Sequence, residues 1–528
     1  MALRSRSRWA IVIVWCAVVL VTAMRHEFYR DEVRALSLTM DAHSLWDLPG
    51  LLQNEGHPVL WYVLLWTGYK LTGSVMVLPV ISLVVSGAAV LIVVFQAPFP
   101  SWLTVLFVFS GLPLYEYSVS ARNYGISMLL LFVFAWLYPR REKHPIVLGL
   151  VLALLCNTNI HSLLLAVILM GLWSWDLVRA IRPRARASQT VQLSIAGLLM
   201  ATGIAGSLVI MWPTDQIAAS DVTRYTVANV ARATVNTLTN PAGMFPDVAP
   251  SPPGALWFVG SMLLVGSTLG LIGRPAVFGA ALAGIVAFSV LFQVVYPGSY
   301  RHQGLLVVFF LALYWIVLAR GEARLRNRFD RIARAGLYGG LPAILAILVA
   351  TGGYYVYADL VHEESASRAL GSFLRMPSAY QHSILIGEPD YFLESLPFYA
   401  DNPIYIVREQ RFGKTVRFVR SARPELSLGE LLRAAWEVRA REKQDVLIAL
   451  GHLEQFDPQS GQASAAGSIE YSYGKTFSWS AEDVRLWKAS TEPVRRYTDN
   501  VIGDERYMIY RLVDSPVSIV GAGLSSTP

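Results

Sequence analysis

Long apolar runs, separated by short polar loops, fill the first 357 residues and limit what the chain can fold into. A spanning helix needs about 20 apolar residues, and lipid offers the backbone no hydrogen-bond partners, so such runs form helices. The runs lie at 9–24, 75–95, 101–114, 124–138, 146–156, 162–178, 191–212, 255–273, 276–295, 304–319 and 337–357. The sequence therefore predicts an α-helical polytopic membrane protein with about eleven transmembrane helices.

Charge divides the chain in two. Only 15% of the residues are charged, against about 25% in soluble domains. Residues 358–528 nevertheless hold 42 of the 81 charged residues, so this part faces water. Its strand-like stretches are 383–386, 404–407, 446–450 and 507–512, and a capping-box pattern runs from Ser427 to Glu430. We expect a transmembrane domain at 1–357 and an extracytoplasmic α/β domain at 358–528.

The distribution of Lys and Arg predicts the orientation, because cytoplasmic loops are enriched in them. The basic clusters lie at 4–8, 140–143, 179–186 and 320–334. All four face the cytoplasm if the apolar stretch 57–71, rich in Trp and Tyr, is an interfacial helix and not a span. We therefore expect eleven spans in the plasma (inner) membrane, a cytoplasmic N-terminus and an extracytoplasmic C-terminus. An even number of spans is the main alternative.

This topology leaves a small set of basic residues on the outer side, where the positive-inside rule selects against them. They are Arg25, Arg30, Arg34, Lys70, Arg122, Arg224, Arg232 and Arg301. Each is a candidate for binding an anion, and the planar guanidinium suits phosphate oxygens. The first outer loop is 25–74. The long, proline-rich loop 213–254 is either a lid over a site or a plain connector with a short helix.

Asp31 and Glu32 follow the first span directly. Apolar residues at helical spacing come after them, which predicts an amphipathic helix lying on the membrane. A partly desolvated carboxylate there suits a general base acting on a hydroxyl. The plainer alternative is that these carboxylates only pair with Arg30 and Arg34.

Three further outer segments place an arginine, histidine or tyrosine at the start of a helix. They contain Arg122 with Tyr124, His161, and Tyr300 with Arg301. Arg122 would equally pair with Glu116, and an Arg beside Tyr is also common interfacial anchoring. The outer histidines lack the spacing of known zinc motifs, and both cysteines lie in apolar runs, so the sequence argues for no metal site and leaves a divalent metal as an open possibility.

Short motifs resemble the GT-C superfamily of polytopic glycosyltransferases, in the branch of protein O-mannosyltransferases and lipid A aminoarabinose transferases. The segments that carry it are Arg30-Asp31-Glu32, Gly56-His57-Pro58 with Tyr62 four residues on, and Ala121-Arg122-Asn123-Tyr124. Asn123 stands where the family usually has Pro, and the family's late Arg-Tyr pair is reversed here.

The resemblance implies a polyprenyl-phosphate sugar donor and an acceptor hydroxyl, of a lipid, glycan or protein, at the outer face. It implies Asp31 as general base, with Glu32 as its substitute. It further implies substrate binding by the residues that match or flank the motifs: His57, Tyr62, Arg122, Tyr124, His161, Tyr300 and Arg301. Attack in line with the leaving phosphate would invert the anomeric carbon.

Two other functions fit the same architecture. A lipid-linked substrate transporter or flippase would usually show internal repeats and charges in mid-membrane, and neither is evident. A non-catalytic membrane scaffold explains the architecture but not the outer carboxylates and arginines. Nothing in the sequence suggests nucleic-acid binding.

Overall fold

The computed structural model describes residues 5–180, 187–212, 214, 226–239, 245, 257–321, 328–376, 380–417, 419, 421–459, 466–471, 474–498 and 503–513. The chain forms two compact units, which we describe separately. Unit 1 contains residues 1–26, 42–214 and 219–360, and unit 2 contains residues 27–41, 215–218 and 361–528. The predicted division near residue 357 is close to the observed one, but segment 27–41 groups with unit 2 and not with the transmembrane part.

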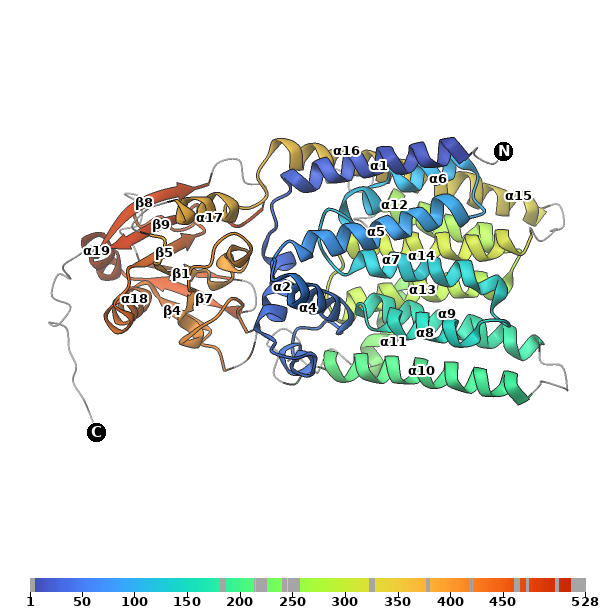
Figure 1. The fold of residues 1–528 in the computed structure, drawn as a ribbon, viewed down its shortest axis with the longest axis horizontal. Coiled ribbons are helices and arrows are strands. Elements are labelled where there is room, and N and C mark those ends of the chain that lie inside the picture. Colours follow the sequence, from blue (N-terminus) through green and yellow to red (C-terminus); the bar gives the residue numbers. More distant parts are fainter. Residues whose placement is uncertain are drawn as a thin grey trace. The chain divides into compact units, whose positions relative to one another are not determined.

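Unit 1 is a bundle of helices, and each of the eleven apolar runs falls on a helix (Figure 1). The helices are α1 (Ser5–Arg25), α3 (Leu48–Leu51), α4 (Leu60–Thr72), α5 (Val77–Gln96), α6 (Ser101–Val108), α7 (Tyr124–Leu137), α8 (Pro145–Cys156), α9 (Ile160–Ala180), α10 (Ala187–Met211), α11 (Val227–Thr239), α12 (Trp257–Thr268), α13 (Pro275–Val294), α14 (Tyr300–Ala319), α15 (Arg328–Ala335) and α16 (Leu341–Val361). In the described part, seven helices are long and apolar enough to cross a membrane, and three apolar helices are shorter.

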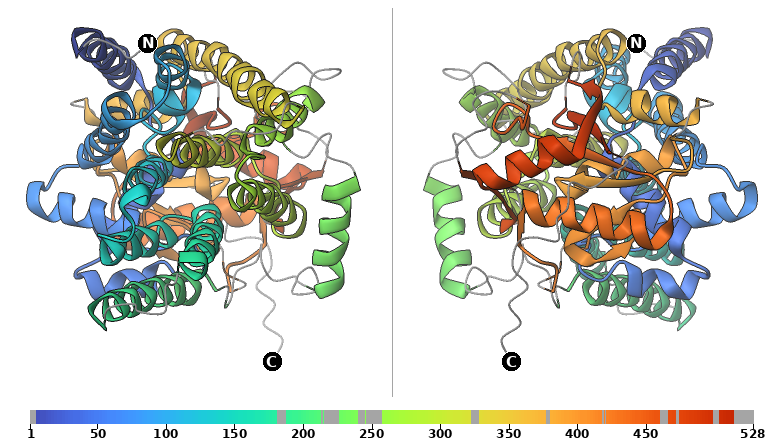
Figure 2. Two further views of the ribbon diagram at one scale, coloured as in Figure 1. Left: turned by 90° about the vertical axis from the view of Figure 1, so that its right-hand side faces the viewer. Right: turned by 90° about the vertical axis from the view of Figure 1, so that its left-hand side faces the viewer.

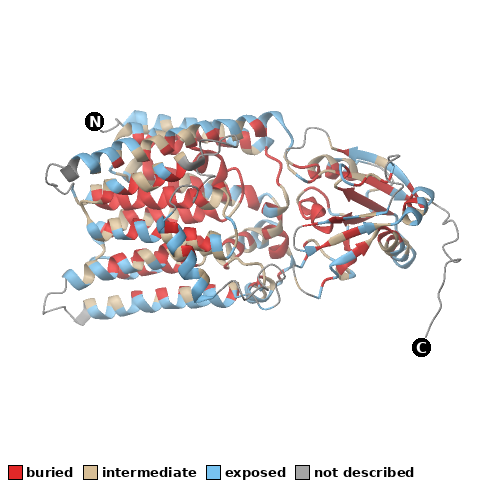
Figure 3. Ribbon diagram, turned by 180° about the vertical axis from the view of Figure 1, so that it is seen from behind, coloured by how far each residue is buried: buried red, intermediate tan, exposed pale blue. Residues whose placement is uncertain are grey.

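Close helix packing holds the bundle together. The helix α14 lies at the centre of the bundle, and 83% of its most apolar 18-residue stretch is buried. Along α8 and α10, small residues let the backbones approach: a Cβ on Gly149 would lie 2.7 Å from the Cα of Ala196, and one on Gly203 would lie 2.8 Å from that of Ala153. Such small-residue contacts are typical of helices that associate in lipid. The helices lie side by side when seen end-on (Figure 2, left), and buried residues gather in the middle of the bundle (Figure 3).

Ion pairs lie at both ends of the helices of unit 1. At one end, Arg141 and Arg320 both pair with Asp176, at 3.6 and 2.5 Å. At the other end, His26 Nδ1 lies 3.0 Å from Asp359 Oδ2, which joins the end of α1 to the end of α16. Which end faces the cytoplasm stays a prediction of the charge pattern.

Unit 2 is an α/β fold built on a four-stranded sheet of order β1-β5-β9-β8. The strands are β1 (Ile384–Glu388), β2 (Tyr405–Ile406), β3 (Arg411–Phe412), β4 (Glu425–Ser427), β5 (Val446–Gly451), β6 (Gly467–Glu470), β7 (Thr476–Trp479), β8 (Thr491–Tyr497) and β9 (Tyr507–Leu512). The strand β1 runs parallel to β5, and β9 is antiparallel to both β5 and β8. Four of these strands overlap the predicted ones, and β9 has the predicted bounds.

Alternate residues along the strands enter two cores, one on each face of the sheet. Ile384 and Ile448 pack with α18 (Leu428–Glu442) and α19 (Ala481–Ser490), whereas Leu385 and Leu447 pack with α17 (Ser367–Arg375). The predicted capping box is present at the start of α18: the Oγ atom of Ser427 accepts from the amide of Glu430. The sheet is therefore covered on both faces (Figure 2, right).

The segment 27–41 contains α2 (Arg30–Asp41), which contacts the 3₁₀ turns η8 (Asp390–Leu393) and η9 (Leu396–Phe398). The amphipathic helix that the sequence predicted here is present. It contacts the α/β fold of unit 2, where Arg30 pairs with Asp504 and Arg34 pairs with Glu394. That this helix also lies on the membrane stays a prediction.

Candidate active site

A hydrogen-bond network joins the starts of α7 and α9 at the predicted outer end of unit 1. Asn123 Nδ2 donates to the carbonyl of Thr158 at 2.9 Å, and Ser127 Oγ donates to Thr158 Oγ1 at 3.0 Å. Asn159 Nδ2 also donates to Ser127 Oγ at 2.9 Å. Because these side chains are buried, the network fixes the two helix starts, and with them Arg122 and His161.

A chain of rings runs across this end of the bundle. The guanidinium of Arg122 lies 5.8 Å from the ring of Tyr124, whose ring lies 5.6 Å from that of His302. The His302 ring stacks on His161 at 4.8 Å, and His161 Nε2 lies 2.8 Å from the hydroxyl of Tyr296. The structure thus links Arg122, Tyr124 and His161, which the sequence named as separate candidates, through His302, and it adds Tyr296 to the group. Their role in substrate binding stays a prediction.

His161 and Tyr124 are the most enclosed members of this ring cluster, each 1% exposed. The Nδ1 atom of His161 has no hydrogen-bond partner among the described residues. Burial raises the pKa of Tyr296, so this phenol stays protonated at neutral pH. Phe288 and Phe292 of α13, about two turns and one turn before Tyr296, also contact the His161 ring. An aromatic site with one unused polar nitrogen suits the ring and hydroxyls of a sugar.

Tyr300 and Arg301 lie in the first turn of α14. Arg301 Nε is 2.9 Å from Glu116 Oε1, and the Arg301 carbonyl accepts from the Tyr117 hydroxyl at 2.7 Å. Tyr300 is buried, with its ring 5.7 Å from that of Tyr355. Arg301 also interacts electrostatically with His302, a member of the ring cluster.

His57 and Tyr62 belong to the loop before α4 and to α4 itself. The amide of Leu60 donates to the carbonyl of Asn157 at 3.0 Å, which places the start of α4 beside the turn that precedes His161. His57 is half-buried and lies close enough to interact electrostatically with His161. Tyr62 is buried in α4. The predicted interfacial segment is thus a helix of 13 residues packed beside the ring cluster.

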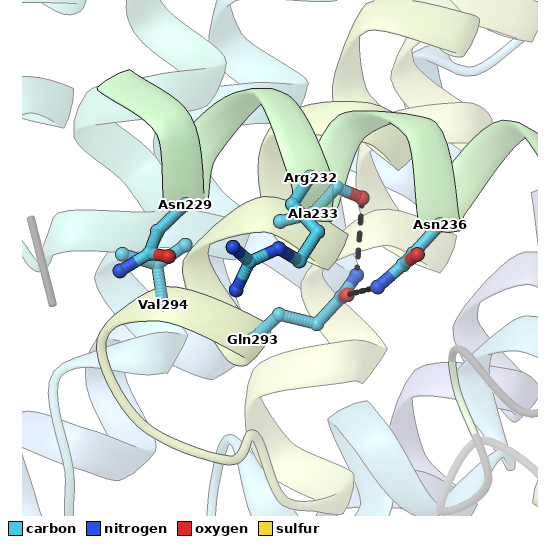
Figure 4. A pocket seen from close by; sticks show the side chains of 6 residues that line it. All are labelled: Asn229, Arg232, Ala233, Asn236, Gln293 and Val294. Carbon is cyan, nitrogen blue, oxygen red and sulfur yellow. Dashed lines mark hydrogen bonds between the residues drawn. The ribbon is translucent and has the colours of Figure 1, made fainter. Parts of the chain in front are cut away.

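A pocket of about 340 Å³ lies between α11 and the end of α13. Asn229, Arg232, Ala233 and Asn236 line it from α11, at the i, i+3, i+4, i+7 spacing of one helix face, and α13 supplies Gln293 and Val294. Gln293 Nε2 donates to the carbonyl of Ala233, and Gln293 Oε1 accepts from Asn236, both at 3.4 Å. Figure 4 shows the guanidinium of Arg232 lying above the end of α13, among these amides.

Arg232 differs from the other outer arginines in its partners. Arg30 pairs with Asp504, Arg34 with Glu394 and Arg301 with Glu116. Arg232 forms no ion pair or side-chain hydrogen bond with another described residue, and α11 contains no Asp or Glu. A pocket that contains this guanidinium and three carboxamides favours an anion that also carries hydroxyl groups.

The other face of α11 is apolar and exposed. Val227 is 87% exposed and Leu238 is 69% exposed. An amphipathic helix of this kind is typical of a membrane surface, where its apolar side enters lipid. The pocket and the ring cluster share the end of α13: residues 288, 292 and 296 face His161, whereas Ser289 and Gln293 bond Thr237 of α11.

The predicted carboxylates Asp31 and Glu32 belong to unit 2, on the first turn of α2. Asp31 is exposed. Glu32 is fully buried, and its Oε2 accepts from the amide of Tyr29 at 3.2 Å, which satisfies a free donor at the helix start. The two carboxylates therefore have different surroundings, although the sequence treated them as alternatives.

Some predictions fall outside the described residues. They include Arg224, most of the loop 213–254 with its prolines, and parts of the basic clusters. Within the described ranges, no group of three or more His, Cys, Asp or Glu side chains is arranged to hold a metal ion.

Sequence reasoning did not place Tyr296 and His302 in the site, although it put their segment on the outer side, and it named Arg232 only as one of eight candidate anion-binding residues. A signal was present for Tyr296 and for Arg232. Aromatic side chains recur at every fourth position, at 288, 292 and 296. The polar residues of α11 share one helical face.

The seven apolar helices and the water-facing α/β unit define a polytopic integral membrane protein. Two crystal structures of ArnT from Cupriavidus metallidurans are similar to it. The structure bound to undecaprenyl phosphate has 11% identity and a TM-score of 0.47, and the apo structure has 12% and 0.42. Each match covers 96% of this chain and 98% of the other. No family model matches the sequence, and no curated protein matches it.

Proposed function

We propose that this protein is a membrane glycosyltransferase that moves a sugar from a polyprenyl-phosphate donor to an acceptor hydroxyl on the extracytoplasmic face. Asp31 is the general base, and outer arginines hold the lipid phosphate. The acceptor is a lipid, glycan or protein, and the membrane is the inner (plasma) membrane. The proposal combines the resemblance of the motifs with the chemistry of the side chains at one end of unit 1.

The pocket at Arg232 is the observation that carries the proposal. A lipid phosphate needs a cation at headgroup depth, and Arg232 is a guanidinium without a carboxylate partner among the described residues. It sits on a helix whose opposite face exposes valines and a leucine, which suits lipid. The amides of Asn229, Asn236 and Gln293 add neutral donors and acceptors. Paired arginines such as Arg30 and Arg34 are poorer candidates, because an anion would have to displace a carboxylate.

The ring cluster supplies the second part of the chemistry. Tyr124, His161, Tyr296 and His302 form an aromatic, largely uncharged surface, and His161 Nδ1 offers a buried polar atom to a ligand. A sugar presents an apolar ring face and several hydroxyls, so both features of the cluster fit it. The cluster contacts the same end of α13 as the pocket, which suits a donor whose sugar follows directly on its phosphate.

The reaction itself needs a base and a stabilised leaving group. A carboxylate that accepts the proton of the acceptor hydroxyl contributes about 10²–10⁴-fold. Cations that stabilise the departing lipid phosphate contribute several kcal/mol. Displacement in line inverts the anomeric carbon, and retention in the product would contradict this part of the proposal.

The test compares glycolipids and surface glycans, by mass spectrometry, from cells that express the wild-type chain, Asp31→Asn or Arg232→Ala at equal amounts. The wild type should add a sugar-bearing product that both variants reduce by at least tenfold. Purified Arg232→Ala in nanodiscs should also bind undecaprenyl phosphate about tenfold more weakly, whereas Asp31→Asn should bind it normally. A control, Arg485→Ala, removes an exposed arginine of unit 2 and should match the wild type.

Unchanged product with Asp31→Asn removes Asp31 from the mechanism, and unchanged binding with Arg232→Ala removes the phosphate role of the pocket. A flippase would instead move the labelled lipid across proteoliposomes that contain no acceptor.

A further inference from the structure

The helix that carries the proposed base is built into the α/β unit. Segment 27–41 follows the first span in the sequence, yet its contacts group it with residues 361–528. The ring of Phe28 lies 4.7 Å from that of Phe398, and the Phe28 carbonyl accepts from the hydroxyl of Tyr399 at 3.2 Å. The entry into α2 is therefore attached to η9 by both apolar and polar contacts.

A second set of bonds fixes the first residue of α2. The guanidinium of Arg30 binds Asp504 with both terminal nitrogens, at 2.6 and 2.9 Å. The Arg30 amide donates to Glu505 Oε1 at 2.9 Å. Glu505 is 1% exposed and accepts from the hydroxyls of Ser365 and Ser395 at 2.5 and 2.7 Å. Because Asp31 is the next residue, its backbone is set by these bonds.

A third attachment lies one turn further along α2. Arg34 pairs with Glu394 and also donates to the carbonyl of Val416 at 2.8 Å. Glu394 accepts in addition from the amide of Val416 at 2.6 Å, so the carboxylate is itself held in place. Arg30 and Arg34 are four residues apart and lie on one face of the helix, on either side of Asp31 in sequence.

These attachments assign a role to the C-terminal unit. We propose, on the basis of the proposed function, that Asp504, Glu505 and Glu394 are positioning residues that hold α2 so that Asp31 is presented in a fixed orientation. They also neutralise the two arginines nearest to Asp31 in the sequence. A displacement of about 1 Å in a reacting group costs about a hundredfold in rate, so a base on a short helix needs such a support.

A purely structural role would predict something different. If these bonds only stabilised unit 2, their loss would lower the amount of folded protein and leave the rate per folded molecule unchanged. A positioning role lowers the maximal rate per folded molecule and leaves the half-saturating donor concentration unchanged, because the donor does not contact these residues.

The test uses the full chain in membranes, with a lipid extract of the host membranes as donor and product measured by mass spectrometry per folded molecule. Asp504→Asn and Arg30→Asp should each lower the maximal rate about 10- to 100-fold, with half-saturation within twofold of the wild type. The reversed pair Arg30→Asp/Asp504→Arg should raise the maximal rate at least tenfold above that of the single variants. Hydrogen exchange of α2 amides should be faster in the single variants and slow again in the reversed pair.

The matched control is Lys414→Ala. It breaks the exposed pair between Lys414 and Asp41, 3.4 Å apart at the far end of α2, and should leave the rate within twofold. The inference is overturned if Asp504→Asn retains the wild-type rate, if Lys414→Ala loses as much, or if the reversed pair restores exchange protection without restoring rate.

Asp31→Asn, measured beside these variants, separates the two proposals. If it abolishes transfer while Asp504→Asn does not affect it, the positioning role fails and the proposed function stands. If Asp31→Asn leaves transfer intact, the proposed base fails, and with it the positioning role, whatever the exchange of α2 shows.

Discussion

A buried ion pair in unit 2 gives a prediction whose size follows from the structure. Arg408 and Glu388 have side chains that are 0% and 1% exposed, and Arg408 Nη2 lies 2.6 Å from Glu388 Oε1. Arg408 also donates to the carbonyls of Pro424 at 2.5 Å and Thr476 at 2.9 Å. It therefore links the end of β1 to β4 and β7. We predict that Arg408→Met destabilises unit 2.

The cost depends on the charge of Glu388. Burial raises the pKa of Glu388 from an ordinary value of 4.5 to about 7, even though Arg408 and Lys475 oppose this rise. Without Arg408, the buried carboxyl group of Glu388 becomes protonated instead of remaining an uncompensated anion. Holding a carboxyl of pKa 4.5 fully protonated costs about 5 kcal/mol at pH 8, against about 3 kcal/mol for the wild-type group with its pKa of about 7, and both costs are about 2 kcal/mol at pH 6. This protonation therefore adds about 1.4 kcal/mol to the penalty of Arg408→Met at pH 8 and almost nothing at pH 6, on top of the loss of the ion pair and hydrogen bonds of Arg408, so the penalty is larger at the higher pH.

The assay is hydrogen exchange of the slowest amides of β5, measured on the full chain at both pH values. A loss of 3–5 kcal/mol at pH 8 makes these amides exchange about a hundred- to several-thousandfold faster. Arg408→Met/Glu388→Met should recover most of this loss, because no charge is left to bury. Arg485→Met removes an exposed pair and should change the free energy by less than about 0.5 kcal/mol. A penalty that is the same at pH 6 and pH 8 would refute the reasoning.

Three further predictions concern other parts of the molecule. Burial raises the pKa of Glu505 from 4.5 to about 7. The stability that Glu505 contributes is therefore full below pH 4.5 and is lost as pH rises through about 7, by about 3 kcal/mol in all. Hydrogen exchange of α2 amides should become faster over this pH range, and Glu505→Gln should remove the pH dependence. Tyr296→Phe leaves a buried nitrogen of His161 unpaired and should cost about 1–3 kcal/mol; an unchanged unfolding temperature would contradict the hydrogen bond. Gly203→Val forces a side chain against the backbone of α8 and should cost about 1–3 kcal/mol, whereas Gly206→Val, with nothing within 4 Å, should be silent in the same thermal assay.

The apolar runs and the strand pattern were predictable because they depend on local composition. Each run falls on a helix, and Tyr507–Leu512 forms the strand that the sequence predicted. The orientation of the bundle in the membrane stays a prediction from the distribution of Lys and Arg. Arg122, Tyr124 and His161 were named from the family resemblance, and no local pattern shows that His302 joins the rings of Tyr124 and His161, since these residues lie far apart in the chain.

Other features depend on long-range contacts that no short pattern encodes. The sequence shows that Asp31 and Glu32 are neighbours, but only the packing of α2 exposes one and buries the other. It shows eight basic residues on the predicted outer side, but only the fold shows which have carboxylate partners and that Arg232 lines a pocket.

By itself, the sequence determined that this chain has a part for lipid and a part for water, because transfer free energy follows from the residues alone. It also determined the start of α18, because the capping box from Ser427 to Glu430 needs only neighbouring residues. The tertiary structure decided that the helix after the first span belongs to the α/β unit. That choice depends on ion pairs such as Arg30 with Asp504, whose members are 474 residues apart and meet only when the chain has folded.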